Sequence, residues 1–313
     1  MDVVLCTDAN YVQPSEVAIC SICYNNEMDI TFHIVTDALS RKKVEELRPV
    51  IKKWDQKVEF YTVDDKKCSY LPYGRSDQPT HASMASYYRL FLASLLPADV
   101  DKLLYLDCDM IVRHSLADLW QTDMRECAIA GVDDMSSMDA DKYNTLKYYP
   151  AEGYFNAGML LINLKYWRDN NLESEFLEFA RMYPERIVFH DQDILNFVLR
   201  DRKLRLPFTY NVQDGFLYDT IHFLMWPYEE EYQEAITDPC IVHYSIRFKP
   251  WHKDCMHPWK DEYLKYLKLA GLNVDSFPQR KENLNLYQRL RPLLVKCGFL
   301  SPLLSFSSKI KPL

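Results

Sequence analysis

The chain has 313 residues, of which 48% are hydrophobic and 14% aromatic. This is enough apolar material for one large α/β domain, with or without an appendage, and it argues against disorder. The formal net charge of −8 excludes a body that binds a polyanion through a general basic field, so nucleic acid is not an expected partner. Nine thinly spread cysteines favour buried thiols in a reducing cytosol over a secreted disulfide framework.

The carboxyl-terminal segment Arg280–Leu313 differs from the rest. It holds seven Lys or Arg against one acid, a net charge of +6, so the remainder carries −14. Leucines and aromatics interleave with the charges, which predicts a basic amphipathic tail on an anionic membrane surface; a helix packed on the core is the alternative. No signal-peptide pattern and no run of about 18 apolar residues occurs. We therefore expect a cytoplasmic protein, peripherally associated with the inner face of the membrane, with a domain at residues 1–270 and a helical tail at 271–313.

The first half of the chain alternates strand-like and helix-like segments. Short apolar runs predict the strands, and longer runs with N-cap residues predict the helices. This βαβα order predicts a Rossmann-like, mainly parallel sheet with helices on both faces. The expected strands are Val3–Thr7, Ile30–Thr36, Val58–Val63 and Lys102–Leu106, and the expected helices are Val12–Tyr24, one from Ser40 to about Trp54, and one around Ser86–Leu95.

The second half is less regular. Strands are expected at Ala128–Val132, Met159–Asn163 and Cys240–His243, and part of a helix at Asp193–Leu199. Only seven glycines occur, and neither G-x-G-x-x-G nor G-K-[ST] is present, which disfavours a dinucleotide-binding domain and a P-loop. The polar, tyrosine-rich segment Met135–Tyr149 is either a lid or acceptor-binding wall, or a flexible surface connection.

Two carboxylates follow directly on the strand Lys102–Leu106, in the sequence Asp107-Cys108-Asp109. Ligands of open α/β sheets bind beyond the carboxyl ends of the strands. Two acids in that place repel each other unless a cation lies beside them, and Mn²⁺ or Mg²⁺ binds carboxylate oxygens well. Such an ion neutralises a departing diphosphate. A D-x-D alone is a weak motif, and its position after a buried strand is what favours a metal site.

Three further polar clusters lie at the ends of predicted elements. Asp8 and Asn10 follow the first strand, where they suit a base or ribose edge, although turns also favour these residues. His190–Asp193 opens a helix, and a helix start explains only one of its acids. His243 leaves the last strand, with Lys249 six residues on; imidazole suits Mn²⁺, and the lysine suits a phosphate.

Together these motifs make the chain similar to the bacterial lipopolysaccharide α-galactosyl- and α-glucosyltransferases of glycosyltransferase family eight, which are relatives of glycogenin. The resemblance runs in order from residue 1 to about residue 260 and is more specific than any single motif. It implies a GT-A type fold and transfer of glucose or galactose from a UDP-sugar to a glycan acceptor, with retention of the anomeric configuration. The matching segments are Asp2–Asn10, Tyr87–Leu90, Leu104–Asp109, Tyr154–Leu164, Asp191–Asn196 and His243–Trp251.

The resemblance also implies a role for each matching residue. Asp107, Asp109 and His243 would hold Mn²⁺, or Mg²⁺, against the diphosphate of UDP, and Lys249 would contact a phosphate oxygen. The acceptor would be a lipopolysaccharide or similar cell-surface oligosaccharide, and the basic tail corresponds to the membrane-associating C-terminus of the lipopolysaccharide enzymes. The other donor-binding residues would be Asp8 and Asn10 for uridine, and Arg89, Asn156, Ala157, Asp191 and Gln192 for the sugar.

One position departs from the family pattern. The family often has glycine a few residues after the metal-binding histidine, where backbone approaches the diphosphate, but this chain has Ser245-Ile246-Arg247. A β-branched residue adopts positive φ only at a cost, so we expect the backbone contact of Ile246 to be lost or moved, with Arg247 as a compensating charge.

Retention requires either a covalent intermediate or front-side attack by the acceptor. Asp191 and Gln192 are the candidate catalytic residues. Gln192 is a weakly basic amide and a poor nucleophile, and Asp191 is chemically better. We favour front-side attack, with a diphosphate oxygen as the base.

Two other interpretations compete. Haloacid-dehalogenase-like phosphatases also place D-x-D after an apolar strand, but their pattern needs Thr or Val two positions after the second acid, where this chain has Ile111. The second is a non-catalytic UDP-sugar-binding scaffold, which the presence of every predicted metal ligand disfavours. The sequence does not distinguish UDP-glucose from UDP-galactose.

Overall fold

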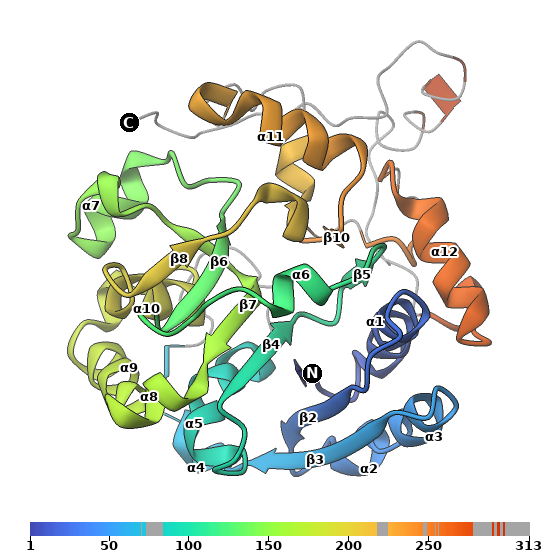
Figure 1. The fold of residues 1–313 in the computed structure, drawn as a ribbon, viewed down its shortest axis with the longest axis horizontal. Coiled ribbons are helices and arrows are strands. Elements are labelled where there is room, and N and C mark those ends of the chain that lie inside the picture. Colours follow the sequence, from blue (N-terminus) through green and yellow to red (C-terminus); the bar gives the residue numbers. More distant parts are fainter. Residues whose placement is uncertain are drawn as a thin grey trace.

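A computed structural model (Figure 1) describes residues 1–69, 71–72, 84–217, 225–246, 249–253, 255, 257–277, 290, 293–294 and 297. The strands are β1 (Asp2–Cys6), β2 (Thr31–Asp37), β3 (Lys57–Val63), β4 (Lys102–Leu106), β5 (Met110–Val112), β6 (Ile129–Asp133), β7 (Phe155–Asn163), β8 (Lys203–Arg205), β9 (Val212–Gln213) and β10 (Ile241–His243). The α-helices are α1 (Val12–Tyr24), α2 (Arg41–Val44), α3 (Leu47–Lys52), α4 (Asp65–Cys68), α5 (Leu92–Leu95), α6 (Ala117–Trp120), α7 (Ala140–Leu146), α8 (Leu164–Asp169), α9 (Leu172–Met182), α10 (His190–Val198), α11 (Met225–Thr237) and α12 (Lys260–Leu269). The 3-10 helices are η1 (Met84–Phe91), η2 (Pro150–Glu152), η3 (Pro184–Arg186), η4 (Phe208–Tyr210), η5 (Asp214–Leu217) and η6 (Val274–Ser276).

The main sheet has the order β3-β2-β1-β4-β7-β6-β8. Strand β7 runs antiparallel to its neighbours β4 and β6, and the other described pairs of this sheet are parallel. A small second sheet pairs β5, β10 and β9. The predicted mainly parallel sheet is therefore confirmed.

Both faces of the main sheet are covered, because successive residues of a strand point to opposite faces. In β1, Val3 and Leu5 belong to a core cluster with α1 and α3, whereas Val4 and Cys6 belong to a cluster with η1, α5, α8, α9 and α10. A strand buried on both sides is apolar throughout, which explains why β1 and β4 were recognisable as short apolar runs. Figure 1 shows α1 and α10 on either side of the sheet.

Two predicted helices differ in detail. The single helix expected from Ser40 to Trp54 is wrong, since the segment forms the separate helices α2 and α3. Pro49 has no N–H to bond the carbonyl of Glu45 one turn back, and that carbonyl instead accepts from the N–H of Arg48. Ser40 does not cap the helix with its side chain; its own N–H donates to Asp37. The helix expected around residues 86–95 is mostly the 3-10 helix η1, followed by α5.

The strand order creates a switch point at the carboxyl ends of β1 and β4. From β1 the sheet extends through β2 to β3 on one side, while the next strand of the chain, β4, lies on the other side of β1. Connections therefore diverge from this point, and a crevice forms where ligands bind in open α/β sheets. Asp8 and Asp107 follow these two strands directly.

The predicted tail lies mostly outside the described residues. Its beginning is described, and Phe277 is buried and stacks on Trp251. Beyond Phe277 the described residues are 290, 293–294 and 297, so the division at residue 270 and the helical tail stay predictions. In the described part of the chain, no helix is both long and apolar enough to cross a membrane.

Asn196 ties α10 to the start of β7. Its Oδ1 accepts from the N–H of Phe155 at 2.8 Å, and its Nδ2 donates to the Phe155 carbonyl at 2.8 Å. An Asn196→Leu variant leaves both buried backbone groups unpaired, so we expect a loss of about 2–4 kcal/mol in the free energy of unfolding, measured by urea denaturation. The same change at exposed Asn144 is the control and is expected to cost less than about 0.5 kcal/mol. An equal loss in the free energy of unfolding in the two variants would contradict a stabilising role for the hydrogen bonds between Asn196 and Phe155.

Candidate active site

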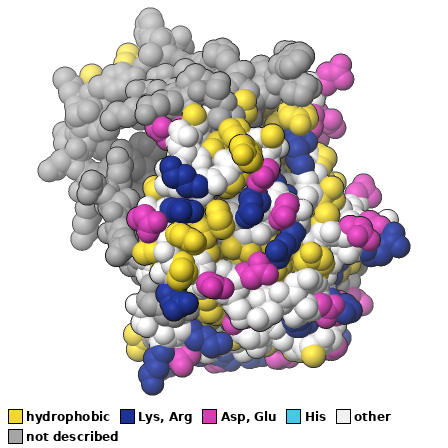
Figure 2. Space-filling model, turned by 90° about the vertical axis from the view of Figure 1, so that its left-hand side faces the viewer, with side chains coloured by type: hydrophobic (Ala, Val, Ile, Leu, Met, Phe, Trp, Pro, Cys, Tyr) yellow, Lys and Arg dark blue, Asp and Glu magenta, His cyan; other side chains and the backbone are white. Residues whose placement is uncertain are grey.

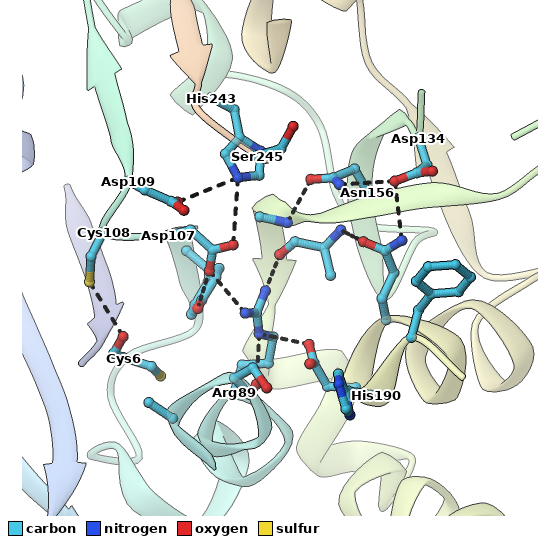
Figure 3. A pocket seen from close by; sticks show the side chains of 18 of the residues that line it. Cys6, Arg89, Asp107, Cys108, Asp109, Asp134, Asn156, His190, His243 and Ser245 are labelled. Atoms are coloured by element: carbon cyan, nitrogen blue, oxygen red, sulfur yellow. Dashed lines mark hydrogen bonds and ion pairs between the residues drawn. The ribbon is translucent and has the colours of Figure 1, made fainter. Parts of the chain in front are cut away.

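Asp107, Asp109 and His243 form a cluster at the carboxyl end of β4. Each offers one ligand atom, and these atoms lie within 4.8 Å of one another. Nε2 of His243 is 3.4 Å from Oδ1 of Asp109 and 3.9 Å from Oδ2 of Asp107 (Figure 3). The backbone fixes this arrangement: the N–H of Asp107 donates to Gly158 of β7, and the carbonyl of Asp109 accepts from Tyr244, just after β10.

The orientation of His243 suits a metal ligand. Its Nδ1 lies 3.0 Å from the side-chain oxygen of Asn211, whose amide nitrogen donates to Asn156. Because an amide oxygen only accepts, Nδ1 is the donor in this contact, and Nε2 is the ring nitrogen that lies beside the two carboxylates. Oδ1 of Asp109 is buried and accepts no hydrogen bond from the described residues. Two carboxylates and an imidazole are a donor set that fits Mn²⁺ or a similar divalent cation.

Gly158 allows this cluster to form. A Cβ atom at this position would lie 2.4 Å from Cε1 of His243 and 2.9 Å from Oδ2 of Asp107. Neither group can move aside without losing a hydrogen bond, because His243 is hydrogen-bonded to Asn211 and Asp107 to Arg89. A side chain at residue 158 would therefore displace the predicted ligands.

Arg89 connects the cluster to the neighbouring predicted residues. Its guanidinium is 2.9 Å from Oδ1 of Asp107 and 2.9 Å from Oδ2 of Asp191, and it also donates to the carbonyl of Ala157. The side chain is buried against the ring of Tyr105. Burial by itself lowers the pKa of Arg89, but Asp107 and Asp191 outweigh it and raise that pKa above its ordinary value. Burial raises the pKa of Asp191, and Arg89 offsets only part of that rise.

Lys249 is the cation beside Asp109. Its Nζ lies 2.6 Å from Oδ2 of Asp109 and also bonds the carbonyl of Tyr244. Burial disfavours the charged form of both groups, but the attraction between the two charges is stronger. Lys249 therefore lowers the pKa of Asp109 below its usual range, and Asp109 raises the pKa of Lys249. An ammonium is therefore fixed next to the predicted metal ligands.

Asn156, Ala157 and Gln192 form a hydrogen-bonded wall. Oε1 of Gln192 accepts from the N–H of Ala157 at 2.9 Å, and its Nε2 donates to Asp134 at 3.2 Å. Asn156 donates to the same carboxylate of Asp134 at 3.0 Å. The orientation of the Gln192 amide is thus set by partners at both ends.

These residues surround one cleft of about 670 Å³, a volume suited to a nucleotide-sugar. Of the predicted site residues, all except Asn10 line it. Asn10 is exposed, and its N–H donates to the Asp8 side chain, as in an Asx turn. Ile246 also lines the cleft, but its N–H donates to Oδ2 of Asp214 at 3.1 Å, so this donor is already used. Arg247, the predicted compensating charge, lies outside the described residues.

The cleft also contains residues that the sequence did not single out. Asp134 follows β6 as Asp107 follows β4, so the same strand-end argument would have found it. Lys142 on α7 and Phe189 before α10 line the cleft, and no sequence motif marks them. The segment 135–149 thus contributes Met135, Ser136 and Lys142 to the wall of the cleft.

The comparisons with known proteins agree with this geometry. A sequence model of glycosyl transferase family 8 matches residues 2–255. The chain belongs to this family. General stress protein A of Bacillus subtilis is 25% identical, over 89% of this chain and 96% of its own length. Lipopolysaccharide 1,2-glucosyltransferase of Escherichia coli K12 is 28% identical, over 95% of this chain and 86% of its own length.

Solved structures extend the comparison. The galactosyltransferase LgtC, solved in complex with donor and acceptor sugar analogues, is 27% identical and superposes with a TM-score of 0.76, covering 87% of this chain and 95% of that one. The predicted resemblance and the GT-A type fold are confirmed. This family 8 member is a hexosyltransferase related to the lipopolysaccharide enzymes. Such an enzyme acts on a sugar donor and a glycan acceptor.

The Arg89 ion pairs predict a pH-dependent effect on stability. An Arg89→Met variant leaves two carboxylates without their buried cation, so we expect the free energy of unfolding to fall by about 3–5 kcal/mol near neutral pH. Asp191 already has a raised pKa in the folded state, and such a carboxyl lowers the stability of the fold progressively as the pH rises from its unfolded-state pKa to its folded-state pKa. Removing Arg89 raises the pKa of Asp191 further. The loss in the free energy of unfolding is therefore largest near about pH 8 and becomes smaller towards about pH 5.

Urea denaturation in EDTA across this pH range measures the deficit without interference from metal binding. Arg125→Met is the matched control, because Arg125 pairs with Asp123 on the surface. It is expected to change stability by less than about 1 kcal/mol at any pH. A deficit in Arg89→Met that stays constant with pH would show that lost packing, rather than charge, is responsible.

Proposed function

We propose that this family 8 glycosyltransferase transfers glucose or galactose from a UDP-sugar to a glycan acceptor, with retention of the anomeric configuration. The observation that carries the proposal is the cluster of Asp107, Asp109 and His243 at the β1/β4 switch point, with Lys249 beside it. A cation site next to a fixed ammonium suits a diphosphate leaving group. The relatives named for transfer of glucose and galactose support a hexose donor.

We propose Mn²⁺ as the cation, with Mg²⁺ as the alternative. Nε2 of His243 lies close to Oδ2 of Asp107 and to Oδ1 of Asp109, which accepts no hydrogen bond from the described residues. Imidazole favours Mn²⁺ over the harder Mg²⁺. When bound, the cation offsets the negative charge that grows on the diphosphate as its bond to the sugar breaks.

The other predicted residues have complementary tasks in this proposal. Asp8 holds uridine at the end of β1, with Asn10 at the exposed rim, and Lys249 contacts a phosphate oxygen. The sugar lies against the hydrogen-bonded wall, which presents the side chains of Asn156 and Gln192. Arg89 bonds the carbonyl of Ala157 and pairs with Asp191, which holds this wall in place.

The contacts of Asp191 and Gln192 favour front-side attack. Gln192 uses its oxygen on Ala157 and its nitrogen on Asp134, which makes it a positioning group rather than a nucleophile. The Asp191 carboxylate is held by Arg89, which stabilises its charge and weakens it as a nucleophile. In the proposed step the sugar–diphosphate bond breaks, the acceptor oxygen bonds the anomeric carbon from the same face, and the acceptor proton passes to a diphosphate oxygen.

Mass spectrometry of the enzyme quenched during turnover tests this step. We expect no protein species that carries one added hexose, because no side chain bonds the sugar. A hexose adduct mapped by peptide analysis to Asp191 would replace front-side attack with double displacement.

The acceptor is proposed by analogy with the named relatives. A lipopolysaccharide or similar cell-surface oligosaccharide fits the glucosyltransferase of Escherichia coli. Contact of the basic tail with an anionic membrane surface stays a prediction from composition.

UDP release from a panel of UDP-sugars tests the proposal without knowledge of the acceptor. We expect slow, Mn²⁺-dependent release of UDP from one UDP-hexose, and a decrease of at least about 100-fold in the Asp107→Asn variant, because one carboxylate ligand is lost. A coupled assay for UDP, with EDTA as the metal-free reference, measures both.

Asp118→Asn is the matched control, since Asp118 is an exposed carboxylate of the same chain. It is expected to retain the wild-type rate. Binding of UDP without release from any donor would favour a non-catalytic scaffold, and absence of UDP binding would rule out the proposal altogether.

A further inference from the structure

Asp214 is a buried acid that does not itself line the cleft. It begins η5, directly after β9, and is only 2% exposed. Its Oδ2 accepts from the N–H of Ile246 at 3.1 Å and from the hydroxyl of Ser245 at 3.2 Å. The Ser245 hydroxyl also accepts from the N–H of Asp214 at 3.3 Å. One buried carboxylate therefore holds two successive residues of the segment that follows β10.

This segment joins two groups of the proposed site. It begins after His243, a predicted metal ligand, and leads to Lys249, the predicted phosphate contact. Figure 3 shows Ser245 beside His243 at the pocket. The far end of the segment is fixed as well, because Nζ of Lys249 bonds Oδ2 of Asp109 at 2.6 Å. Asp214 bonds the segment between these two ends and so restricts the path of the backbone that carries Lys249.

The two neighbours of Asp214 in the chain contact another part of the cleft wall. Oε1 of Gln213 accepts from the N–H of Met135 at 2.8 Å. Met135 also packs on Gly215, where a Cβ atom would lie 2.5 Å from its Sδ. Met135 lines the cleft, as Ser245 does. These three successive residues therefore form a bracket that joins two segments of the cleft wall.

A diphosphate needs a cation that is fixed inside the cleft, because the surface is not basic. The chain carries a net charge of −8. Figure 2 shows Lys or Arg interspersed with Asp or Glu on the face that bears α7, α9 and α10, with no large area of one sign. A mixed surface of this kind does not attract phosphate from a distance, so binding depends on the position of single cations such as Lys249.

Asp214 also favours the charged form of Lys249. Burial lowers the pKa of Lys249, but Asp109 outweighs burial, and Asp214 adds to the rise in that pKa. Asp109 is the direct partner of the ammonium, and Asp214 is a further acid in its field. The same carboxylate that holds the backbone of the segment thus lies near the cation at its end.

We propose that Asp214 is a positioning residue for the diphosphate end of the site. By accepting hydrogen bonds from Ser245 and Ile246, it fixes the segment between His243 and Lys249 and holds Lys249 where a phosphate oxygen binds. This role rests on the proposed function and deepens it, because Asp214 acts on the diphosphate only through its neighbours.

A comparison of UDP with uridine tests this role, because the two ligands share the nucleoside and differ in the diphosphate. Asp214→Ala removes both hydrogen bonds of Oδ2. We expect its Kd for UDP with Mn²⁺, measured by isothermal titration calorimetry, to rise about 10- to 30-fold, as for the loss of two hydrogen bonds. Its Kd for uridine, measured by NMR titration in EDTA, is expected to stay within about threefold of the wild-type value.

Two further variants separate positioning from folding. Asp214→Asn keeps an oxygen acceptor for both partners, and Nε2 of His257, at 3.7 Å, is too far from Oδ1 for a hydrogen bond that this change could break. Its Kd for UDP is expected to stay within about threefold of the wild type, since Asp109 still pairs with Lys249. Ser245→Ala removes the hydroxyl and leaves the bond to Ile246, so it carries the test even where Asp214→Ala does not fold. Its Kd for UDP is expected to rise about three- to tenfold, with uridine binding unchanged.

Asn26→Ala is the matched control. Asn26 is also buried, its Oδ1 accepts from the N–H of Leu116, and neither residue lines the cleft. This variant is expected to keep the wild-type Kd for UDP.

An unchanged Kd for UDP in Asp214→Ala or in Ser245→Ala overturns the positioning role while the proposed function stands. An equal weakening of uridine binding overturns it too, as does a loss of UDP affinity in Asp214→Asn or Asn26→Ala as large as in Asp214→Ala. Absence of UDP binding by the wild type overturns the proposed function and the role of Asp214 with it.

Discussion

The guanidinium of Arg89 lies between Asp107 and Asp191 and bonds the carbonyl of Ala157, and the rest of the site depends on this contact. Asp107 follows β4, Ala157 belongs to β7, Asp191 to α10 and Arg89 to η1, so one side chain fixes four segments. Without it, two carboxylates would face each other in a buried place and one would take up a proton. Arg89 thus allows an acidic site to exist inside an apolar fold, and its first role is to position other groups.

Apart from Asp8, each acid that lines the cleft has a cation close by, which explains how so many charges lie close together. Asp109 pairs with Lys249, and Asp134 lies near Lys142 at the other end. The pairs differ in their hydrogen bonds. Lys249 bonds its carboxylate at 2.6 Å, whereas the donors of Lys142 have no acceptor in the described structure. Both ends of the cleft thus hold a buried cation beside a carboxylate, but only Lys249 is hydrogen-bonded to its partner.

The backbone near Ile246 shows how a family contact changes when its glycine is absent. Ile246 is not among the described residues with positive φ, and its N–H is bound by Asp214. Asp214 is buried, bonds Ser245 as well, and lies 3.7 Å from Nε2 of His257. Burial lowers the pKa of His257, so this imidazole is neutral and packs in the core rather than adding charge. In the proposed function the phosphate contact then falls to Lys249, which hydrogen bonds to Asp109 and Tyr244 hold in place.

The sequence by itself determined the fold class and pointed to most of the candidate site, because strand burial and strand-end acids leave local patterns. Apolar runs such as Lys102–Leu106 identified the strands, and Asp107, Asp109 and His243 stood at their ends. The tertiary structure alone decided which of these groups meet. It placed Arg89 between Asp107 and Asp191, set His243 against Asn211, and brought His243 and Asp107 close to Gly158. Lys142 had no sequence signal beyond its place in the segment 135–149, since its surroundings, two aromatic rings and an acid, lie outside its own helix. Such contacts join residues far apart in the chain, and only the folded packing brings them together.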